Sequence, residues 1–366
     1  MSDRPGVGAS LPDFPWDSLA GAGAVARAHP DGIVNLSVGT PVDPTPELGQ
    51  RALTEAADSP GYPTTIGTPE LRAAMVGYLR DRWAATELTE AGVLPVIGTK
   101  ELVAWLPILL GLRADDTVMY PSVAYPTYAV GAQLAGCRGV AADGGDAVRE
   151  HRPALLWLNS PSNPTGQVLD ADELADVVAA AREVGAVVAS DECYGEFGWE
   201  AEPVSVLDAR VNGGSYEGLL AIHSLSKRSN LAGYRAGLVG GDAALVGDLT
   251  QARKHLGMMV SAPVQAAMAA LLADQSHVAE QRRRYAGRRQ LLRPALERAG
   301  FRIDHAEAGL YLWATRQEDC RASVDWFAER GILVAPGDFY GTSAGQHVRI
   351  ALTATDERID AAASRL

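Results

Sequence analysis

Apolar residues recur along the chain with the spacing of helices, and the clearest of these patterns follows residue 67. After Thr68-Pro69-Glu70, apolar side chains stand every four positions at Leu71, Met75 and Leu79, as on one face of a helix. Threonine is a preferred N-cap residue, and proline is favoured in the first helical turn. We therefore expect a helix that begins at Pro69 with Thr68 as its cap.

Short apolar runs alternate with the helical patterns and predict strands. Five of them occupy residues 93–97, 117–120, 155–158, 186–189 and 219–222. Each is bounded by turn residues or a helical pattern, as in strands buried on both faces of a parallel sheet. Between two runs, Asp170 stands three positions before Glu173, a capping-box arrangement that predicts another helix. These repeated units predict an α/β fold with a large three-layer α/β/α domain around a mostly parallel sheet.

The rhythm changes beyond about residue 250 and predicts a smaller α+β domain. An arginine-rich helical pattern is followed by three apolar runs, at 278–299 and then 301–315, 332–335 and 347–352. We expect an N-terminal segment that joins the small domain, a large ligand-binding domain and a small C-terminal domain, at 1–45, 46–250 and 251–366. No repeat or long linker interrupts the pattern, so we expect the domains to pack tightly.

The bulk properties exclude several classes of protein. The 366 residues are 47% hydrophobic, enough to bury a large core. The formal net charge of -13 argues against a nucleic-acid partner, because phosphate binding needs a basic face. We expect a cytoplasmic protein, because no run of 18 apolar residues predicts a membrane span and residues 1–18 lack a secretion-signal pattern. Cys137, Cys193 and Cys320 form no CxxC pair, so we expect reduced thiols and no metal site.

Polar residues gather where the predicted strands end. They are Gly98-Thr99-Lys100, Asn159 to Gly166, Asp191 to Tyr194, and Ser224 to Lys227. Ligands of such sheets bind beyond the carboxyl ends of the strands. We therefore expect four strand ends to converge on one site.

Ser224, Ser226 and Lys227 predict an anion site together with Arg235, which follows eight positions later and is flanked by glycines. The two hydroxyls can donate hydrogen bonds, and an arginine can hold a phosphate bidentately. A lysine beside an arginine and away from bulk water should have a lowered pKa, which favours Schiff-base chemistry. Taken alone, the same stretch is equally compatible with a solvated charged turn.

Asp191 ends an apolar strand, where an unpaired carboxylate is costly. A pyridinium N–H would satisfy it, and the ion pair would keep that ring an electron sink. Tyr194, and Asn163 in a loop stiffened by two prolines, could both hydrogen-bond the phenolic oxygen of such a ring. Without that ligand, Asp191 would cap a helix and the loop would be a tight turn.

In order and spacing these motifs resemble the class I/II aminotransferases of pyridoxal 5'-phosphate fold type I. The resemblance covers about Leu36 to Arg349 and is carried by Asn163-Pro164-x-Gly166, Asp191-x-x-Tyr194 and Ser224-x-Ser226-Lys227 with Arg235. Each motif is weak alone, whereas all of them in order on the expected strand ends are specific. The resemblance implies pyridoxal 5'-phosphate as cofactor, with an amino-acid donor and a 2-oxo-acid acceptor as substrates.

The resemblance implies a role for each residue. Lys227 would form the imine with the cofactor and move the substrate proton, and Asp191 would pair with the pyridine nitrogen. The implied cofactor-binding residues are Gly98, Thr99, Lys100, Tyr125, Asn163, Asp191, Tyr194, Ser224, Ser226, Lys227, Arg235 and Tyr62. Tyr125 would stack on the ring, although Tyr128 and Val123 are competing alignments. Tyr62 would reach the phosphate of a partner subunit, which implies a homodimer with shared sites.

Arg349, Asn163 and Gly39 are the implied substrate-binding residues, with Arg349 as the clamp for the α-carboxylate and Gly39 closing over the substrate. An arginine within an apolar strand is costly unless paired, so a ligand carboxylate is a reasonable partner. Lys100 departs from the small or apolar residue common at this position, and it could contact phosphate, substrate or neither.

The whole chain is similar to actinobacterial N-succinyl-LL-2,6-diaminopimelate aminotransferases, including residues 11–17 and 226–235. That similarity implies conversion of N-succinyl-LL-2,6-diaminopimelate and 2-oxoglutarate to N-succinyl-2-amino-6-oxopimelate and glutamate, in lysine and peptidoglycan-precursor synthesis. Such a substrate carries carboxylates far from the reacting carbon. A second cationic contact is therefore expected, and Lys100, Arg228 and Arg253 are the candidates.

Three alternatives share some or all of these motifs. Another aminotransferase, for aspartate, acetylornithine or an aromatic amino acid, would share them all. A pyridoxal-phosphate-dependent C–S lyase could use the same electron sink to expel a leaving group. An aminotransferase-like transcription regulator would need a DNA-binding domain before the fold, for which the short leading segment has little room, and the acidity of the chain disfavours it.

Overall fold

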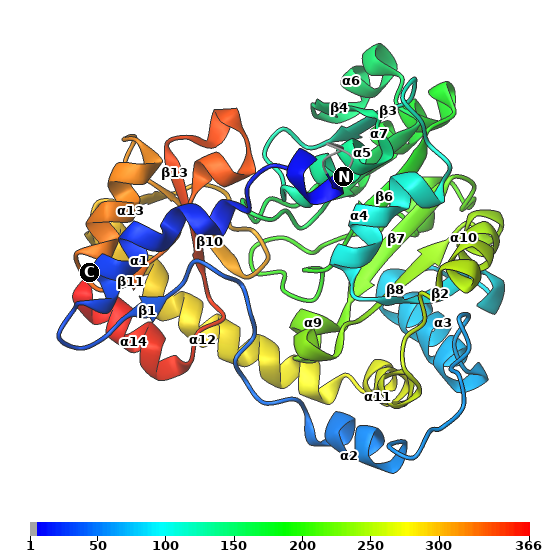
Figure 1. Ribbon diagram of the computed structural model, residues 1–366, viewed down its shortest axis with the longest axis horizontal. Helices are drawn as coiled ribbons and strands as arrows, with labels where there is room; N and C mark the ends of the chain where they lie inside the picture. Colours follow the sequence, from blue (N-terminus) through cyan, green and yellow to red (C-terminus); the bar gives the residue numbers. More distant parts are fainter. Residues whose placement is uncertain (1–5) are drawn as a thin grey trace, which may run out of the picture.

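A computed structural model describes residues 6–366 and shows two domains of unequal size side by side (Figure 1). The first five residues, part of the segment for which the sequence predicts no secretion signal, lie outside the described residues. The larger domain surrounds a seven-stranded sheet, and the smaller one contains a four-stranded sheet with helices. The predicted α/β fold class is confirmed.

The sheet of the larger domain has the strand order β2-β8-β7-β6-β5-β3-β4. Its strands are β2 (Val93–Ile97), β3 (Thr117–Tyr120), β4 (Arg138–Ala141), β5 (Leu155–Asn159), β6 (Val187–Asp191), β7 (Leu219–Ser224) and β8 (Ala236–Gly241). All five apolar runs form strands within two residues of the expected ends. The sequence pattern misses β4, a largely exposed edge strand, and β8, which is rich in glycine.

The expectation that each of the five runs pairs with parallel neighbouring strands is wrong for residues 93–97. β2 pairs with β8 alone, and both β2 and β7 are antiparallel to β8. The two reversals cancel, so β2 runs in the same direction as β5, β6 and β7. For this reason the residues after β2 reach the same edge of the sheet as Asp191. Arg235 reaches that edge too, because it immediately precedes the reversed strand β8.

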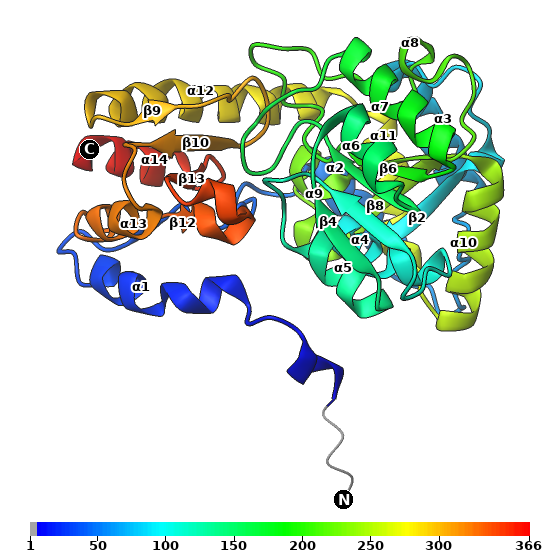
Figure 2. The same ribbon diagram turned by 90° about the horizontal axis from the view of Figure 1, so that it is seen from above.

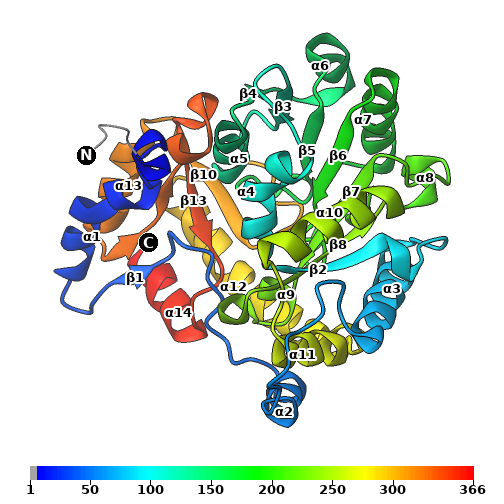
Figure 3. The same ribbon diagram turned by 45° about the vertical axis from the view of Figure 1, so that its right-hand side comes forward.

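Helices cover both faces of this sheet and complete the three layers (Figure 3). One face packs against α4 (Thr99–Leu109), α5 (Thr127–Ala135) and α10 (Ala243–Leu256). The other packs against α3 (Pro69–Trp83), α6 (Gly144–His151), α7 (Ala171–Val184), α8 (Ala209–Asn212) and α11 (Ala262–Ala273). Consecutive residues of β5 serve opposite faces, since Trp157 packs on the first face and Leu156 and Leu158 on the second.

The two predicted helix starts are confirmed. The Thr68 hydroxyl accepts a hydrogen bond from the Leu71 backbone N–H at 3.2 Å at the start of α3. Asp170 accepts from the Glu173 backbone N–H at 2.9 Å, and the Glu173 carboxylate accepts from the Asp170 N–H at 2.8 Å. Both halves of the capping box are therefore present at α7. The predicted apolar stripe of α3 is fully buried.

The smaller domain is built from segments near both ends of the chain, which include α1 and α14. Its antiparallel sheet has the order β12-β13-β10-β9, from β9 (Arg302–Ile303), β10 (Tyr311–Thr315), β12 (Ala335–Pro336) and β13 (His347–Ala351). Its helices are α1 (Ala20–Arg27), α12 (Ser276–Arg298), α13 (Cys320–Ala328) and α14 (Asp356–Arg365). β1 (Val34–Asn35) pairs with β11 (Ile332–Leu333), and α1 packs on α13 at the outer side of the domain (Figure 2).

The long helix α12 spans the two domains. It contacts α14 in the smaller domain and α9 (Leu225–Arg228) in the larger one (Figure 1). The preceding α11 packs on α3 and on α2 (Glu47–Glu55), and Met268 and Leu271 belong to the core of the larger domain. The domain boundaries stay a prediction, and the packing of α11 favours a second boundary after residue 273.

Candidate active site

A cavity of about 590 Å³ lies at the sheet edge where β5, β6 and β7 end, and the smaller domain closes its other side. Twelve of the fourteen predicted site residues line it: Gly39, Thr99, Lys100, Tyr125, Asn163, Asp191, Tyr194, Ser224, Ser226, Lys227, Arg235 and Arg349. Gly98 lies directly behind the wall, in contact with Arg235. Tyr62 lies outside this cavity and is 96% exposed. The strand ends therefore converge as expected.

Lys227 lies on α9, the short helix that follows β7. Its ammonium donates to the Gly39 carbonyl, on a segment that arrives from the smaller domain. Burial lowers the pKa of Lys227, and the positive charges of Arg349 and Arg235 act in the same direction against the opposing effect of Tyr311. A lowered pKa leaves more of the amine unprotonated and able to attack a carbonyl carbon.

Asp191 presents a buried carboxylate with two neutral donors. The Tyr128 hydroxyl donates to it at 2.9 Å, and the Cys193 backbone N–H donates at 3.2 Å. Burial raises the pKa of Asp191. Neither donor carries a positive charge, so the site is suited to a cationic N–H from a ligand. Tyr128, considered above as a stacking ring, instead holds Asp191 and stacks on Trp157 with ring centroids 5.0 Å apart.

Asn159 organises the floor of the cavity, although the sequence analysis assigned it no role. Its amide donates to the Asp191 carbonyl at 2.9 Å and to the Pro161 carbonyl at 3.2 Å. Its side-chain oxygen accepts from the Asn163 backbone N–H at 2.8 Å. These bonds fix the proline-rich loop to the end of β6. The only sequence signal was the place of Asn159 at the end of a strand.

Tyr311 is a second residue that the sequence analysis missed. It lies on β10 of the smaller domain, and its hydroxyl is 3.0 Å from the hydroxyl of Tyr194. A Cβ atom on residue 39 would lie 2.0 Å from the Tyr311 hydroxyl, so only glycine fits there. A tyrosine within an apolar strand gives no sign of such a role, because tyrosine is common in strands.

Arg349 lies on β13 and is 2% exposed. Its guanidinium donates to the Asn163 side-chain oxygen at 2.9 Å and to the Ser37 carbonyl at 2.7 Å, and it stands 4.0 Å above the Tyr311 ring. Both acceptors are uncharged, and Nε is buried with no hydrogen-bond partner among residues 6–366. A buried guanidinium without an acid partner is suited to an anionic ligand.

The N-terminus of α4 forms an anion site with the side chains around it. Gly98 caps the helix with φ +71°, and a Cβ atom there would lie 2.3 Å from an Arg235 guanidinium nitrogen. Ser224 caps α9 by accepting from the Ser226 backbone N–H at 3.1 Å. Free N–H groups at a helix start, with an arginine and two hydroxyls nearby, match the requirements of a phosphate monoester.

Of the three candidates for a second cationic contact, the structure brings only Lys100 to the cavity. Its ammonium lies 5.4 Å from the ring centre of Phe14 and 5.8 Å from that of Tyr125. Arg228 is buried and pairs with Glu196. Arg253 is fully buried in an ion pair with Glu101. The last two arginines stabilise the fold and are not available to this cavity.

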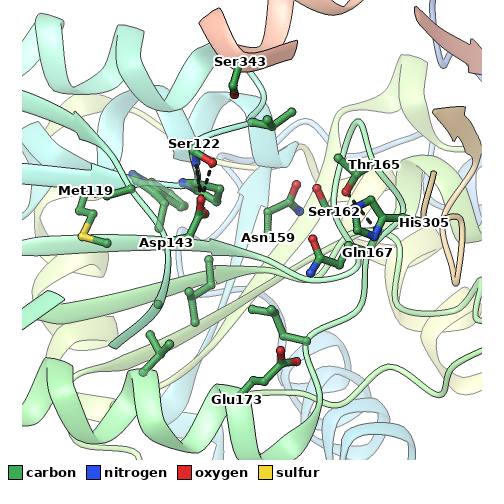
Figure 4. A pocket seen from close by; sticks show the side chains of 18 of the residues that line it. Met119, Ser122, Asp143, Asn159, Ser162, Thr165, Gln167, Glu173, His305 and Ser343 are labelled. Carbon is green, nitrogen blue, oxygen red and sulfur yellow. Dashed lines mark hydrogen bonds between the residues drawn. The ribbon is translucent and has the colours of Figure 1, made fainter. Parts of the chain in front are cut away.

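A second cavity of about 540 Å³ is lined in part by Ser162, Thr165 and Gln167 of the proline-rich loop (Figure 4). Asn159 contributes to both cavities. In Figure 4 the Ser122 hydroxyl points at Asp143, to which it donates a hydrogen bond. No lysine or arginine is among the described residues that line this cavity, and its charged lining includes Asp143 and Glu173. It therefore does not suit a phosphorylated ligand.

Comparison with known proteins identifies the class to which this fold and site belong. The family model described as aminotransferase class I and II matches residues 31–366. The chain therefore belongs to the class I and II aminotransferases, as the sequence motifs predicted, and it is a transaminase that uses pyridoxal 5'-phosphate. Within residues 6–366, no helix is long and apolar enough to cross a membrane.

Two relatives and one solved structure show this similarity. Probable aminotransferase Rv1178 of Mycobacterium tuberculosis is 62% identical, over 99% of this chain and 87% of the relative. The 4-dedimethylamino-4-oxo-anhydrotetracycline transaminase OxyQ of Streptomyces rimosus is 58% identical, over 97% of this chain and 99% of OxyQ. The solved structure of N-succinyldiaminopimelate aminotransferase from Mycobacterium tuberculosis superposes with a TM-score of 0.85 at 26% identity, over 97% of this chain and 99% of that one.

The residues of the cavity fit pyridoxal 5'-phosphate. Asp191 is a buried carboxylate held by neutral donors, as a ring N–H⁺ requires. The start of α4 with Arg235 suits the phosphate, and Lys227, which lines the same cavity, has a lowered pKa.

Proposed function

We propose that the chain transfers the amino group of N-succinyl-LL-2,6-diaminopimelate to 2-oxoglutarate. The observation that carries this proposal is the presence of Arg349 and Lys100 in one cavity, neither of them held by an acidic side chain. A donor with one carboxylate at the reacting carbon and others at a distance would satisfy both cations. The likeness to a solved N-succinyldiaminopimelate aminotransferase adds support.

In the proposed mechanism, the Lys227 amine would hold the cofactor and, when free, would move the proton of the substrate α-carbon. When bound, pyridoxal 5'-phosphate supplies an electron sink for the charge that this proton leaves behind. Asp191 would keep the ring nitrogen protonated, and Asn163 and Tyr194 would bind the phenolic oxygen. Gly98, Thr99, Ser224, Ser226 and Arg235 would hold the phosphate, and Tyr125 would stack on the ring.

Arg349 binds the substrate α-carboxylate through its guanidinium, which Asn163 and the Ser37 carbonyl hold in place. This orientation directs the α-carbon toward Lys227. Lys100 binds a distal carboxylate at the mouth of the cavity. The two aromatic rings beside Lys100 limit the conformations of its side chain without neutralising its charge.

We also propose a cytoplasmic homodimer with shared sites. Tyr62 does not line the cavity of its own chain and is almost fully exposed, as expected of a residue that contacts the phosphate in a second subunit. Val38 and Val42, on the segment that carries Gly39, are exposed as well, at 43% and 49%. An apolar exposed face beside the site is a suitable subunit contact.

A second candidate substrate is a polycyclic ketone of the kind in the name of OxyQ. Phe14, Trp16 and Tyr125 place three aromatic rings around the cavity and could stack on such a ligand. Under this alternative, Lys100 would contribute little to the choice of substrate, so a variant at this position separates the two proposals.

The test is a panel of amino donors and oxo acids on the purified enzyme and on Lys100→Gln, with Lys254→Gln as a matched control on an exposed helix face. We expect N-succinyl-LL-2,6-diaminopimelate to be the best donor, with kcat/KM reduced about twofold to fivefold in Lys100→Gln, the upper range of one partly exposed ion pair. Turnover of alanine should be unchanged.

Three outcomes of the panel contradict the proposal. A strong preference for aspartate or for an uncharged donor would exclude the diaminopimelate substrate. Efficient amination of an anhydrotetracycline ketone, insensitive to Lys100→Gln, would favour the second candidate. Release of pyruvate and ammonia without an oxo-acid acceptor would indicate a lyase.

A further inference from the structure

Two buried tyrosines from different domains meet at the cavity. Tyr194 follows β6 of the larger domain, Tyr311 lies on β10 of the smaller one, and their hydroxyl oxygens are 3.0 Å apart. They are 8% and 4% exposed, and their rings pack edge to face with centroids 5.5 Å apart. Two hydroxyls that share one hydrogen bond leave one proton free for another acceptor.

The charges around the pair decide which tyrosine donates. The Arg349 guanidinium lies 4.0 Å above the Tyr311 ring, and the positive charges of Arg349 and Lys227 lower the pKa of Tyr311 against the opposing effect of burial. Burial and the neighbouring Tyr311 raise the pKa of Tyr194. Either hydroxyl can donate in this hydrogen bond, and the stronger acidity of Tyr311 favours donation from Tyr311 to the Tyr194 oxygen.

This direction leaves the Tyr194 proton without an acceptor among residues 6–366. Within residues 6–366, Tyr311 is the single hydrogen-bond partner of the Tyr194 hydroxyl. Tyr194 lines the cavity beside Asp191, so its free proton is available to a ligand there. A hydroxyl that accepts one hydrogen bond is polarised and becomes a stronger donor in the next.

The position of the Tyr311 hydroxyl is fixed from two sides. Gly39 leaves just enough room for it, since a Cβ atom at that position would lie 2.0 Å away. The ring itself is held under Arg349. The donor therefore has little freedom to turn away from Tyr194.

We propose that Tyr311 is a positioning residue for the cofactor: by donating to Tyr194 it directs the Tyr194 proton onto the phenolic oxygen and strengthens that hydrogen bond. This inference rests on the proposed placement of Tyr194. With the cofactor bound, its phenolic oxygen would share a proton with the Lys227 nitrogen. A stronger bond from Tyr194 withdraws charge from the oxygen, so the shared proton leaves at lower pH.

The test is a pH titration of the absorbance of the bound cofactor in Tyr311→Phe, which removes one oxygen and keeps the ring under Arg349. We expect the midpoint to rise by about half a pH unit, a fraction of the rise in Tyr194→Phe, because the polarisation of one bond by the next is a partial effect. The Km for the amino donor should change little, since the contacts of Arg349 remain.

Two further variants make the test specific. Tyr340→Phe is the matched control, because Tyr340 also stands near Arg349, at 5.1 Å, but its hydroxyl is buried with no partner among the described residues. Its midpoint should equal that of the wild type. The double variant Tyr194→Phe/Tyr311→Phe should have the midpoint of Tyr194→Phe alone, since Tyr311 acts through Tyr194.

Gly39→Ala provides an independent test that leaves Tyr311 in the chain. The added methyl group must displace the Tyr311 hydroxyl, so the midpoint should rise as in Tyr311→Phe. An unchanged or lowered midpoint in Tyr311→Phe, or equal shifts in Tyr311→Phe and Tyr340→Phe, would overturn the inference while leaving the proposed function intact. A wild-type enzyme whose cofactor absorbance does not titrate would overturn the inference, whereas failure of the proposed function would appear as absent transaminase turnover.

Discussion

Replacement of Arg349 by lysine tests whether this residue binds the substrate carboxylate. The guanidinium already donates to Asn163 at 2.9 Å and to the Ser37 carbonyl at 2.7 Å, and these bonds orient its remaining N–H groups toward the cavity. A substrate carboxylate can accept two parallel bonds from an arginine but only one well-directed bond from a lysine. A charge-assisted hydrogen bond contributes about 1.5 to 3 kcal/mol.

Lysine would lose one of the two hydrogen bonds to the substrate carboxylate and misplace the second. The predicted loss of transition-state binding free energy is about 2 to 3 kcal/mol. This corresponds to a fall in kcat/KM for the amino donor of about 30- to 150-fold. The assay compares kcat/KM of Arg349→Lys with that of Arg302→Lys, an exposed ion-paired arginine in the same small sheet. The cofactor absorbance should stay close to that of the wild type. A loss below threefold, or an equal loss in both variants, would refute the carboxylate role of Arg349.

Two further predictions concern stability. Burial raises the pKa of Asp191 in the folded apoenzyme. The stability that this carboxyl group contributes is therefore present at low pH, where it is protonated, and is lost as pH rises through the folded-state pKa. At pH 8 the cofactor-free Asp191→Asn variant should therefore melt at a higher temperature than the wild type, with an unfolding free energy larger by about 1 kcal/mol. The variant loaded with cofactor should lose kcat. A lower melting temperature for the cofactor-free variant would contradict this account. Asp170→Ala removes the capping box of α7 and should lower the unfolding free energy measured by calorimetry by about 1 kcal/mol, with kcat/KM unchanged. A large loss of activity would show that this cap does more than stabilise its helix.

The sequence predicted those parts of the fold and site that depend on local chemistry. Thr68 and the Asp170–Glu173 pair start helices in the way that their side chains dictate. Buried strands between helices appear as apolar runs, because both of their faces are covered. The polar residues that follow those runs converge because parallel strands end at one edge of the sheet, so Asp191 and Lys227 could be placed in one site.

The features that the sequence analysis missed depend on contacts between distant parts of the chain. β8 contains several glycines, and its antiparallel direction follows from the connection of the strands, which no local pattern encodes. Tyr311 and Asn159 are ordinary strand residues until the fold brings Tyr194 and the Asn163 loop beside them. Burial also decides which charges are free, and it removes Arg253 from the set of possible substrate contacts.

The most direct measurement of the central claim is the location of the cofactor on the chain. The chain contains three lysines, Lys100, Lys227 and Lys254. Borohydride reduction of the loaded enzyme, followed by digestion and mass spectrometry, should place the phosphopyridoxyl group on Lys227 alone, and Lys227→Ala should lose both the label and transaminase turnover. A label on Lys100 or Lys254, or substantial turnover in Lys227→Ala, would contradict the account.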